Sequence, residues 1–207
     1  TVFELLGFTS KGLICALIFP LLHTVILFSG PLLQNYYNGV FYFYKSSWYW
    51  KSCFRNHVWL RSHLVGPISE EIVYRACMLP TLIPNFGVAK SIVLSPLFFG
   101  MAHFHHVFAL VKDGMPLKSA LIKACFQFTY TTLFGIYSAF VFVRTGDTIL
   151  PCILSHMFCN HMGFPNFIEV LQCQDQSMKS KIIFFYVVGL VLFFILLVPL
   201  TKPSLYE

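Results

Sequence analysis

The sequence predicts an all-α fold, a polytopic bundle of transmembrane helices. Of the 207 residues, 57% are hydrophobic and only 11% are charged, whereas a soluble domain carries roughly 25% charged residues. Phenylalanine occurs 24 times, and aromatic side chains suit both lipid-facing surfaces and the interfacial belts of membrane helices. Several apolar stretches also approach the length of about 20 residues that a helix needs to cross a bilayer. These observations favour a chain embedded in the lipid bilayer.

The net charge of +6 does not indicate nucleic-acid binding. The basic residues lie between the apolar stretches rather than in one dense patch, and the most basic segment contains Lys45, Lys51, Arg55 and Arg61 without an acidic residue. Lysine and arginine are enriched in the short cytoplasmic loops of membrane proteins. We therefore exclude nucleic acid as a partner and expect residues 45–61 on the cytosolic side.

Charged and turn-forming residues divide the chain into elements. The expected membrane spans are residues 12–30, 88–111, 120–143, 148–163 and 182–200, with a further helix over about 63–84. The aromatic segment 36–50 is expected at the membrane interface. Residues 112–118 and 144–147 are expected to form short turns, and residues 165–181 a mixed polar loop.

The cysteines are expected to be structural. There are seven, without a CxxC pair, so a disulfide framework or a zinc knuckle is not indicated. Five lie in apolar stretches, which favours buried, inert thiols: Cys15, Cys77, Cys125, Cys152 and Cys159.

Three charged residues stand close together in this apolar chain: Glu70, Glu71 and Arg75. Glu71 and Arg75 have the order and spacing of a helical ion pair, whereas Glu70 lies about 100° around the helix and can point into a cavity. The bland alternative is one network that holds helices together. We favour a functional role, because ionisable residues inside membranes are costly and usually mark a site. Two carboxylates beside one arginine also leave a surplus carboxylate, which suits a general base.

Two further polar groups are expected at the same depth in the membrane. If residues 112–118 are also cytosolic, Glu70, His103, His156 and Asn160 all lie one to two turns from the cytosolic ends of their helices, about 6–12 Å deep. His156 and Asn160 are four residues apart and can both donate hydrogen bonds into a cavity. Polar contacts between helices are the alternative for each group. Their convergence at one depth in one leaflet is what a single active site requires.

Two chemistries fit these residues. Glu70 and His103 can activate a water that attacks an amide, while His156 and Asn160 stabilise the oxyanion. The alternative is a zinc-dependent intramembrane protease that uses the same Glu and His residues, although the HExxH pattern is absent. We favour catalysis without a cofactor. A cysteine nucleophile at Cys77 or Cys159 lacks an evident thiolate-stabilising setting.

A third possibility is a non-catalytic transporter or scaffold that uses Glu70, Glu71 and Arg75 as a buried proton or ion relay. Against it, the sequence shows no inverted repeat and no pair of broken helices.

Three spaced motifs resemble those of the type II CAAX prenyl endopeptidases, within the wider CAAX-protease and bacteriocin-processing group. They are Glu70-Glu71-x-x-x-Arg75, Phe99-x-x-x-His103 and His156-x-x-x-Asn160. The stretches 66–80 and 98–106 resemble the eukaryotic Ras-converting branch. The resemblance covers roughly residues 12–200, without a departure at a motif position.

The resemblance implies a metal-independent glutamate protease of the endoplasmic reticulum membrane. It would be a multi-pass protein whose active site lies in an intramembrane catalytic cavity open to the cytosol. It would remove the last three residues of farnesylated or geranylgeranylated CAAX proteins such as Ras-like GTPases. Glu70 and His103 would be catalytic, His156 and Asn160 would stabilise the oxyanion, and Glu71 and Arg75 would support the site. Residues 1–207 would form one membrane-embedded protease domain that lacks a further N-terminal helix of the family.

Overall fold

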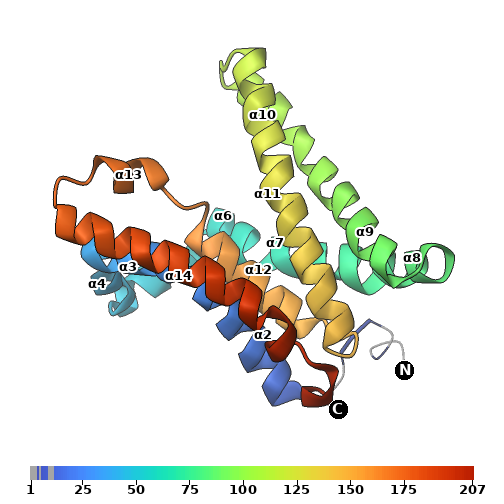
Figure 1. Ribbon diagram of the computed structural model, residues 1–207. Helices are drawn as coiled ribbons and strands as arrows, with labels where there is room; N and C mark the ends of the chain where they lie inside the picture. The colour runs from blue at the N-terminus through green and yellow to red at the C-terminus, as the bar shows by residue number, and fades with distance from the viewer. Residues whose placement is uncertain (1–3, 5, 9–11) are drawn as a thin grey trace. The chain divides into compact units, whose positions relative to one another are not determined.

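The computed structural model describes residues 4, 6–8 and 12–207. Within these residues every regular element is a helix (Figure 1), which confirms the predicted all-α class. The chain divides into two compact units, and the division falls inside helices α7 and α12. The expectation of one protease domain over residues 1–207 stays a prediction.

The first unit contains the described residues up to Phe8 together with Ser69–Cys152. Its elements are the end of α7 (Gly66–Glu71), the π-helix η2 (Ile72–Met78), α8 (Leu79–Phe86), α9 (Val88–Ala102), the 3₁₀-helix η3 (His103–His105), α10 (His106–Lys112), α11 (Leu117–Arg144) and the start of α12 (Leu150–Met162).

The second unit contains residues 12–68 and Ile153–Glu207 of the described chain. Its elements are α2 (Leu13–Leu27), α3 (Ser29–Tyr37), α4 (Val40–Tyr44), α5 (Ser47–Arg55), α6 (His57–Leu60), the π-helix η1 (Arg61–Val65), the start of α7, the remainder of α12, α13 (Phe167–Gln172), α14 (Gln176–Leu200) and the 3₁₀-helix η4 (Pro203–Leu205).

The first unit is organised around α9 and α11, which lie side by side (Figure 1). Glycines on both helices allow this close approach. A Cβ atom added to Gly135 on α11 would lie 2.7 Å from the Cβ of Pro96 on α9, and one added to Gly100 would meet Thr132 and Phe128 on α11. Small residues at helix contacts are the usual way in which membrane helices pack closely.

The second unit is organised around α14, which packs against α2 and α3. A Cβ atom added to Gly189 on α14 would meet the side chain of Ser29 and the backbone of Ile26. One ring nitrogen of His23, which is fully buried on α2, lies 2.7 Å from the carbonyl oxygen of Phe193 on α14. This contact is a polar contact between two apolar helices, and it involves a histidine that the sequence patterns did not identify.

Three described helical stretches are long and apolar enough to cross a membrane: Val88–Lys112, Leu117–Arg144 and Gln176–Leu200. They confirm three of the expected spans. The expected span over 12–30 is instead the bent pair α2 and α3, whose axes differ by 66° and which would provide a fourth crossing. Several apolar helices thus indicate a multi-pass membrane protein.

Two expected elements differ from the structure in length. Helix α12 has 13 residues, or about 20 Å at 1.5 Å per residue, so the predicted span over 148–163 is too short to cross about 30 Å of hydrocarbon. The helix expected over 63–84 extends over 57–86, but it consists of short α and π segments and is not among the long apolar stretches.

Two local expectations were wrong. The polar loop over 165–181 contains α13 and the start of α14, because the side chains of Asn166 and Asp175 accept hydrogen bonds from backbone N–H groups and cap these helices. The seven cysteines, all within the described residues, are free thiols in the structure. However, Cys77 and Cys125 are exposed rather than buried, since they lie on outward faces of apolar helices, where a thiol needs no protein contact.

Candidate functional site

Glu70 and Glu71 lie in α7, between two π-helical segments. The helical region begins after Asn56, whose side chain accepts hydrogen bonds from the N–H groups of Val58 and Trp59. It ends at Gly87, which has a φ of 76°. π-Helical turns widen the backbone and occur frequently at functional sites. The two carboxylates therefore sit where the helix departs from regular α geometry on both sides.

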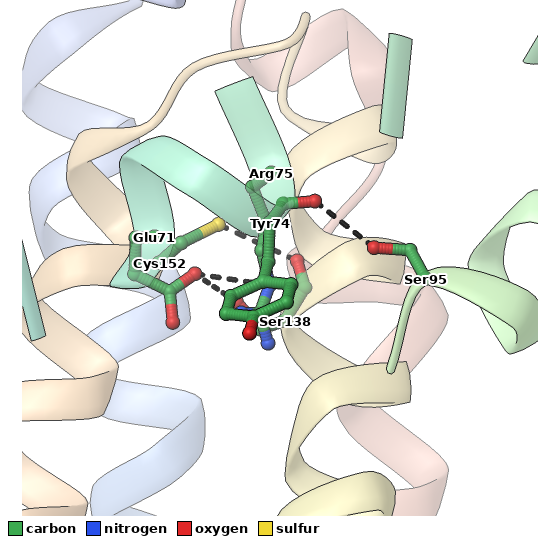
Figure 2. A network of polar contacts seen from close by, with 6 residues as sticks. All are labelled: Glu71, Tyr74, Arg75, Ser95, Ser138 and Cys152. Carbon is green, nitrogen blue, oxygen red and sulfur yellow. Dashed lines mark hydrogen bonds and ion pairs between the residues drawn. The ribbon is translucent and has the colours of Figure 1, made fainter. Parts of the chain in front are cut away.

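The predicted ion pair between Glu71 and Arg75 is present. Arg75 Nε lies 3.0 Å from Glu71 Oε2, and the two side chains are 1% and 0% exposed. The hydroxyl of Ser138 on α11 donates a hydrogen bond of 2.8 Å to the same carboxylate oxygen (Figure 2). A buried charge pair is stable only when such additional hydrogen bonds compensate for lost hydration. Glu71 is thus held from two helices.

The guanidinium of Arg75 lies over two aromatic rings. Its central carbon is 4.8 Å from the ring centre of Phe99 and 5.9 Å from that of Phe134. Within the described part of the chain, its two terminal nitrogens have no hydrogen-bond partner. Cation–π attraction and the nearby carboxylate of Glu71 therefore stabilise this buried cation. Loss of Glu71 would leave it with aromatic contacts as its main compensation.

Further hydrogen bonds connect the same region to α9 and α12. The Ser95 hydroxyl donates to the carbonyl oxygen of Tyr74 at 3.0 Å, and the Cys152 thiol donates to that of Ser138 at 3.4 Å (Figure 2). Sequence reasoning missed Ser95 and Ser138. Their only sequence signal is a small polar residue within an apolar stretch, which is too common in membrane helices to identify a site residue.

Glu70 and His103 both belong to the first unit, and both are half-buried. Glu70 precedes Glu71 and so faces another direction around the helix. His103 follows α9, and its Nδ1 lies 2.9 Å from the carbonyl oxygen of Phe99. Since a carbonyl oxygen only accepts hydrogen bonds, Nδ1 carries the proton in this contact, and the neutral ring then keeps its lone pair on Nε2. That is the arrangement a general base requires.

His156 and Asn160 belong to the second unit. His156 is 4% exposed. Asn160, one turn further along α12, is exposed, and its Nδ2 donates a hydrogen bond of 2.9 Å to the carbonyl oxygen of Ser62. A carboxamide has two N–H donors, so this contact fixes the side chain of Asn160 and leaves a second N–H for another acceptor.

An aromatic cluster surrounds His161, the residue that follows Asn160 in α12. His161 Nε2 lies 3.0 Å from the hydroxyl of Tyr44, and its ring stacks on Trp50 with centroids 6.1 Å apart. A tyrosine hydroxyl is protonated at neutral pH and can donate to His161, and burial raises the pKa of Tyr44 further above its usual range. His63, which stacks on Trp59, also lies edge-on to His161, with ring centroids 5.9 Å apart. The end of α12 is thereby held against α4, α5 and η1.

The six predicted residues are thus distributed over both units. The ion pair between Glu71 and Arg75 is confirmed, whereas the catalytic roles of Glu70 and His103 and the oxyanion role of His156 and Asn160 stay predictions. Among the residues that the structure describes, no three His, Cys, Asp or Glu side chains gather as a metal-binding group.

Comparison with known proteins covers the whole predicted site. A family model described as type II CAAX prenyl endopeptidase Rce1-like matches residues 53–162, which include all six residues. The chain is 39% identical to CAAX prenyl protease 2 of Homo sapiens, over 100% of this chain and 64% of that protein. It is 34% identical to the protein of that name from Rattus norvegicus, over 100% of this chain and 61% of the relative.

A yeast relative is more similar over a shorter region. CAAX prenyl protease 2 of Saccharomyces cerevisiae is 44% identical over 53% of this chain and 37% of the relative. The chain therefore spans less than two thirds of the length of these curated relatives. No solved structure matches it.

Proposed function

Because the chain belongs to the type II CAAX prenyl endopeptidase family, we propose that it is an intramembrane endopeptidase that removes the C-terminal tripeptide from prenylated CAAX proteins. The observation that carries the proposal is the match over residues 53–162, which contains every charged and polar residue of the predicted site. The substrates would be farnesylated or geranylgeranylated proteins such as Ras-like GTPases.

Glu70 and His103 would activate the attacking water. With its Nδ1 proton held by the carbonyl oxygen of Phe99, His103 presents Nε2 as the acceptor for a proton of the water, and Glu70 provides a carboxylate that can accept or relay it. The water oxygen bonds to the carbonyl carbon of the prenylated cysteine. When the C–N bond breaks, the proton passes to the leaving amine of the tripeptide.

His156 and Asn160 would stabilise the negative charge that develops on the carbonyl oxygen. The bond from Asn160 to Ser62 fixes the carboxamide in advance, and donors that are already oriented need no reorganisation when the oxyanion forms. Glu71 and Arg75 would hold α7 and η2 in place through Ser138, Phe99 and Phe134 rather than touch the substrate.

The membrane setting suits a lipid-modified substrate. A prenyl group partitions into bilayers, so it would bring the scissile bond to the level of the site by lateral diffusion. On the basis of the family resemblance, we place the enzyme in the endoplasmic reticulum membrane. The basic excess of residues 45–61 is typical of cytosolic segments and supports a site open to the cytosol.

The test is peptide cleavage by the purified chain in detergent. A farnesylated CAAX peptide is expected to release an intact tripeptide, identified by mass, and the same peptide without the farnesyl group is expected to be cut far more slowly. Absence of cleavage, or cleavage at another bond, would contradict the proposal.

Chelation separates the metal-free mechanism from the zinc alternative. We expect activity to survive a strong zinc chelator, because the proposed steps use only Glu70, His103, His156 and Asn160. Loss of activity that zinc alone restores would instead support the zinc-dependent protease. Unchanged cleavage in Glu70→Gln would exclude Glu70 as the catalytic carboxylate. Absence of cleavage by the wild-type chain would favour the non-catalytic transporter or scaffold, with Glu70, Glu71 and Arg75 as a relay.

A further inference from the structure

Helix α5 (Ser47–Arg55) presents a basic face to its surroundings. Trp48 precedes Lys51 and Ser52 by three and four positions, and Arg55 follows them by four and three, so the four residues share one side of the helix. All four are exposed, and Trp48 is 75% exposed. Together with Asn56 they line a shallow pocket. We call these five residues the α5 basic face.

The opposite side of α5 is fixed within the second unit. Trp50 Nε1 donates a hydrogen bond of 2.8 Å to the carbonyl oxygen of Tyr44, and the ring of Trp50 stacks on His161. Tyr49 also packs against Tyr44, with ring centroids 5.5 Å apart. These contacts fix the rotation of α5 about its axis. The outward direction of the basic face is therefore a consequence of packing on the other side.

The charge and donors of this face suit a phosphate group. Lys51 and Arg55 supply two cations one turn apart, Ser52 adds a hydroxyl, and Asn56 retains its amide N–H₂ because only its oxygen caps α6. No acidic residue occurs in the sequence between Glu4 and Glu70. The charges of Lys51 and Arg55 are therefore not neutralised by a carboxylate from residues 5–69. Arginine and lysine beside hydroxyl and amide donors are typical phosphate ligands.

We propose that the α5 basic face binds the headgroup phosphates of anionic phospholipids at the membrane surface. The exposed indole of Trp48 decides in favour of a lipid partner over a soluble acidic protein, because Trp side chains concentrate at the boundary between hydrocarbon and water. Basic clusters next to membrane helices attract anionic lipids in the same way. The α5 basic face would hold anionic lipids next to the membrane-spanning helices.

Lipid retention tests this inference without relying on cleavage. The chain is purified in detergent and incubated with equal amounts of palmitoyl-oleoyl phosphatidylserine and phosphatidylcholine, and bound lipids are counted by native mass spectrometry. Wild type is expected to retain phosphatidylserine preferentially. The double variant Lys51→Gln/Arg55→Gln is expected to lose most of this preference, by about fivefold or more. Because lipid binding is measured directly, the same result is expected even if the chain has no catalytic activity.

A matched control removes the same charge elsewhere. Lys90→Gln/Lys202→Gln changes two exposed lysines outside α5 and is expected to keep the wild-type preference for phosphatidylserine. In a second control, excess soluble glycerophosphoserine is added to the wild-type chain, and the preference is expected to remain. Equal lipid preference in the Lys51/Arg55 variant and this control would overturn the proposal. Displacement by the soluble headgroup would overturn it too, since that would identify a site for small anions rather than a membrane surface.

Discussion

At the level of single residues, the main contrast is between two adjacent carboxylates. Glu71 is fully buried and contacts Arg75 and Ser138, whereas Glu70 is half-buried on another side of the helix. The spacing of Glu71 and Arg75 was enough to predict their ion pair from sequence, because i,i+4 contacts depend only on local helix geometry. The contact with Ser138 could not be predicted, because it joins residues 67 positions apart and depends on how α11 packs.

This contrast predicts different effects for the two Glu→Gln substitutions. Glu71→Gln leaves the cation of Arg75 buried without its counter-charge, and breaking a buried pair costs about 3–5 kcal/mol. A clear fall in the thermal unfolding temperature is therefore expected in detergent. Glu70→Gln is expected to unfold close to wild type while losing cleavage. Equal thermal stability of both variants would show that the Glu71 network does not support the fold.

Ser138 should act through Glu71. Ser138→Ala removes a hydrogen bond to a buried carboxylate, which costs about 1–3 kcal/mol, so a lower unfolding temperature is expected. Ser119→Ala, an exposed serine on the same helix, is the control and is expected to have little effect. If the two variants unfold at the same temperature, the bond from Ser138 contributes nothing measurable.

At the level of helices, close packing of α9 and α11 fixes where Phe99, His103 and Ser138 lie. Gly135→Ala would place a Cβ atom 2.7 Å from that of Pro96, and such overpacking typically costs about 1–3 kcal/mol. The loss should exceed the gain of roughly 1 kcal/mol in helix propensity from Gly to Ala. We expect lower thermal stability, while Lys123→Ala on the exposed side of α11 stays close to wild type.

The sequence predicted the long apolar helices better than the short elements. The three spans of 25–28 residues have a strong and continuous apolar signal. Helix α13 was missed because it has six residues and only a capping pattern, in which Asn166 precedes Glu169 by three positions. The 66° bend between α2 and α3 falls at Phe28, directly before Ser29, Gly30 and Pro31. Such residues often mark helix kinks, but the continuous apolar composition of residues 12–30 suggested one straight span.

At the level of the whole molecule, sequence patterns predicted an all-α membrane protein, and the family match supports the predicted activity. The polar motifs were identified because charged and polar side chains are rare in this chain. The mutual arrangement of Glu70 and His103 with His156 and Asn160 depends instead on tertiary contacts, which spacing along the sequence does not determine. The predicted common depth of these residues in the membrane therefore stays a prediction.

The central claim is that Glu70 and His103 activate the water that cleaves a prenylated CAAX peptide. The most direct test compares the rate of tripeptide release by wild type, Glu70→Ala and His103→Ala, with thermal unfolding measured on each preparation. Positioned acid–base groups contribute about 10²–10⁴ in rate, so both variants are predicted to remain folded and to lose cleavage by at least about 100-fold. Folded variants that retain cleavage within about tenfold of wild type would contradict the account.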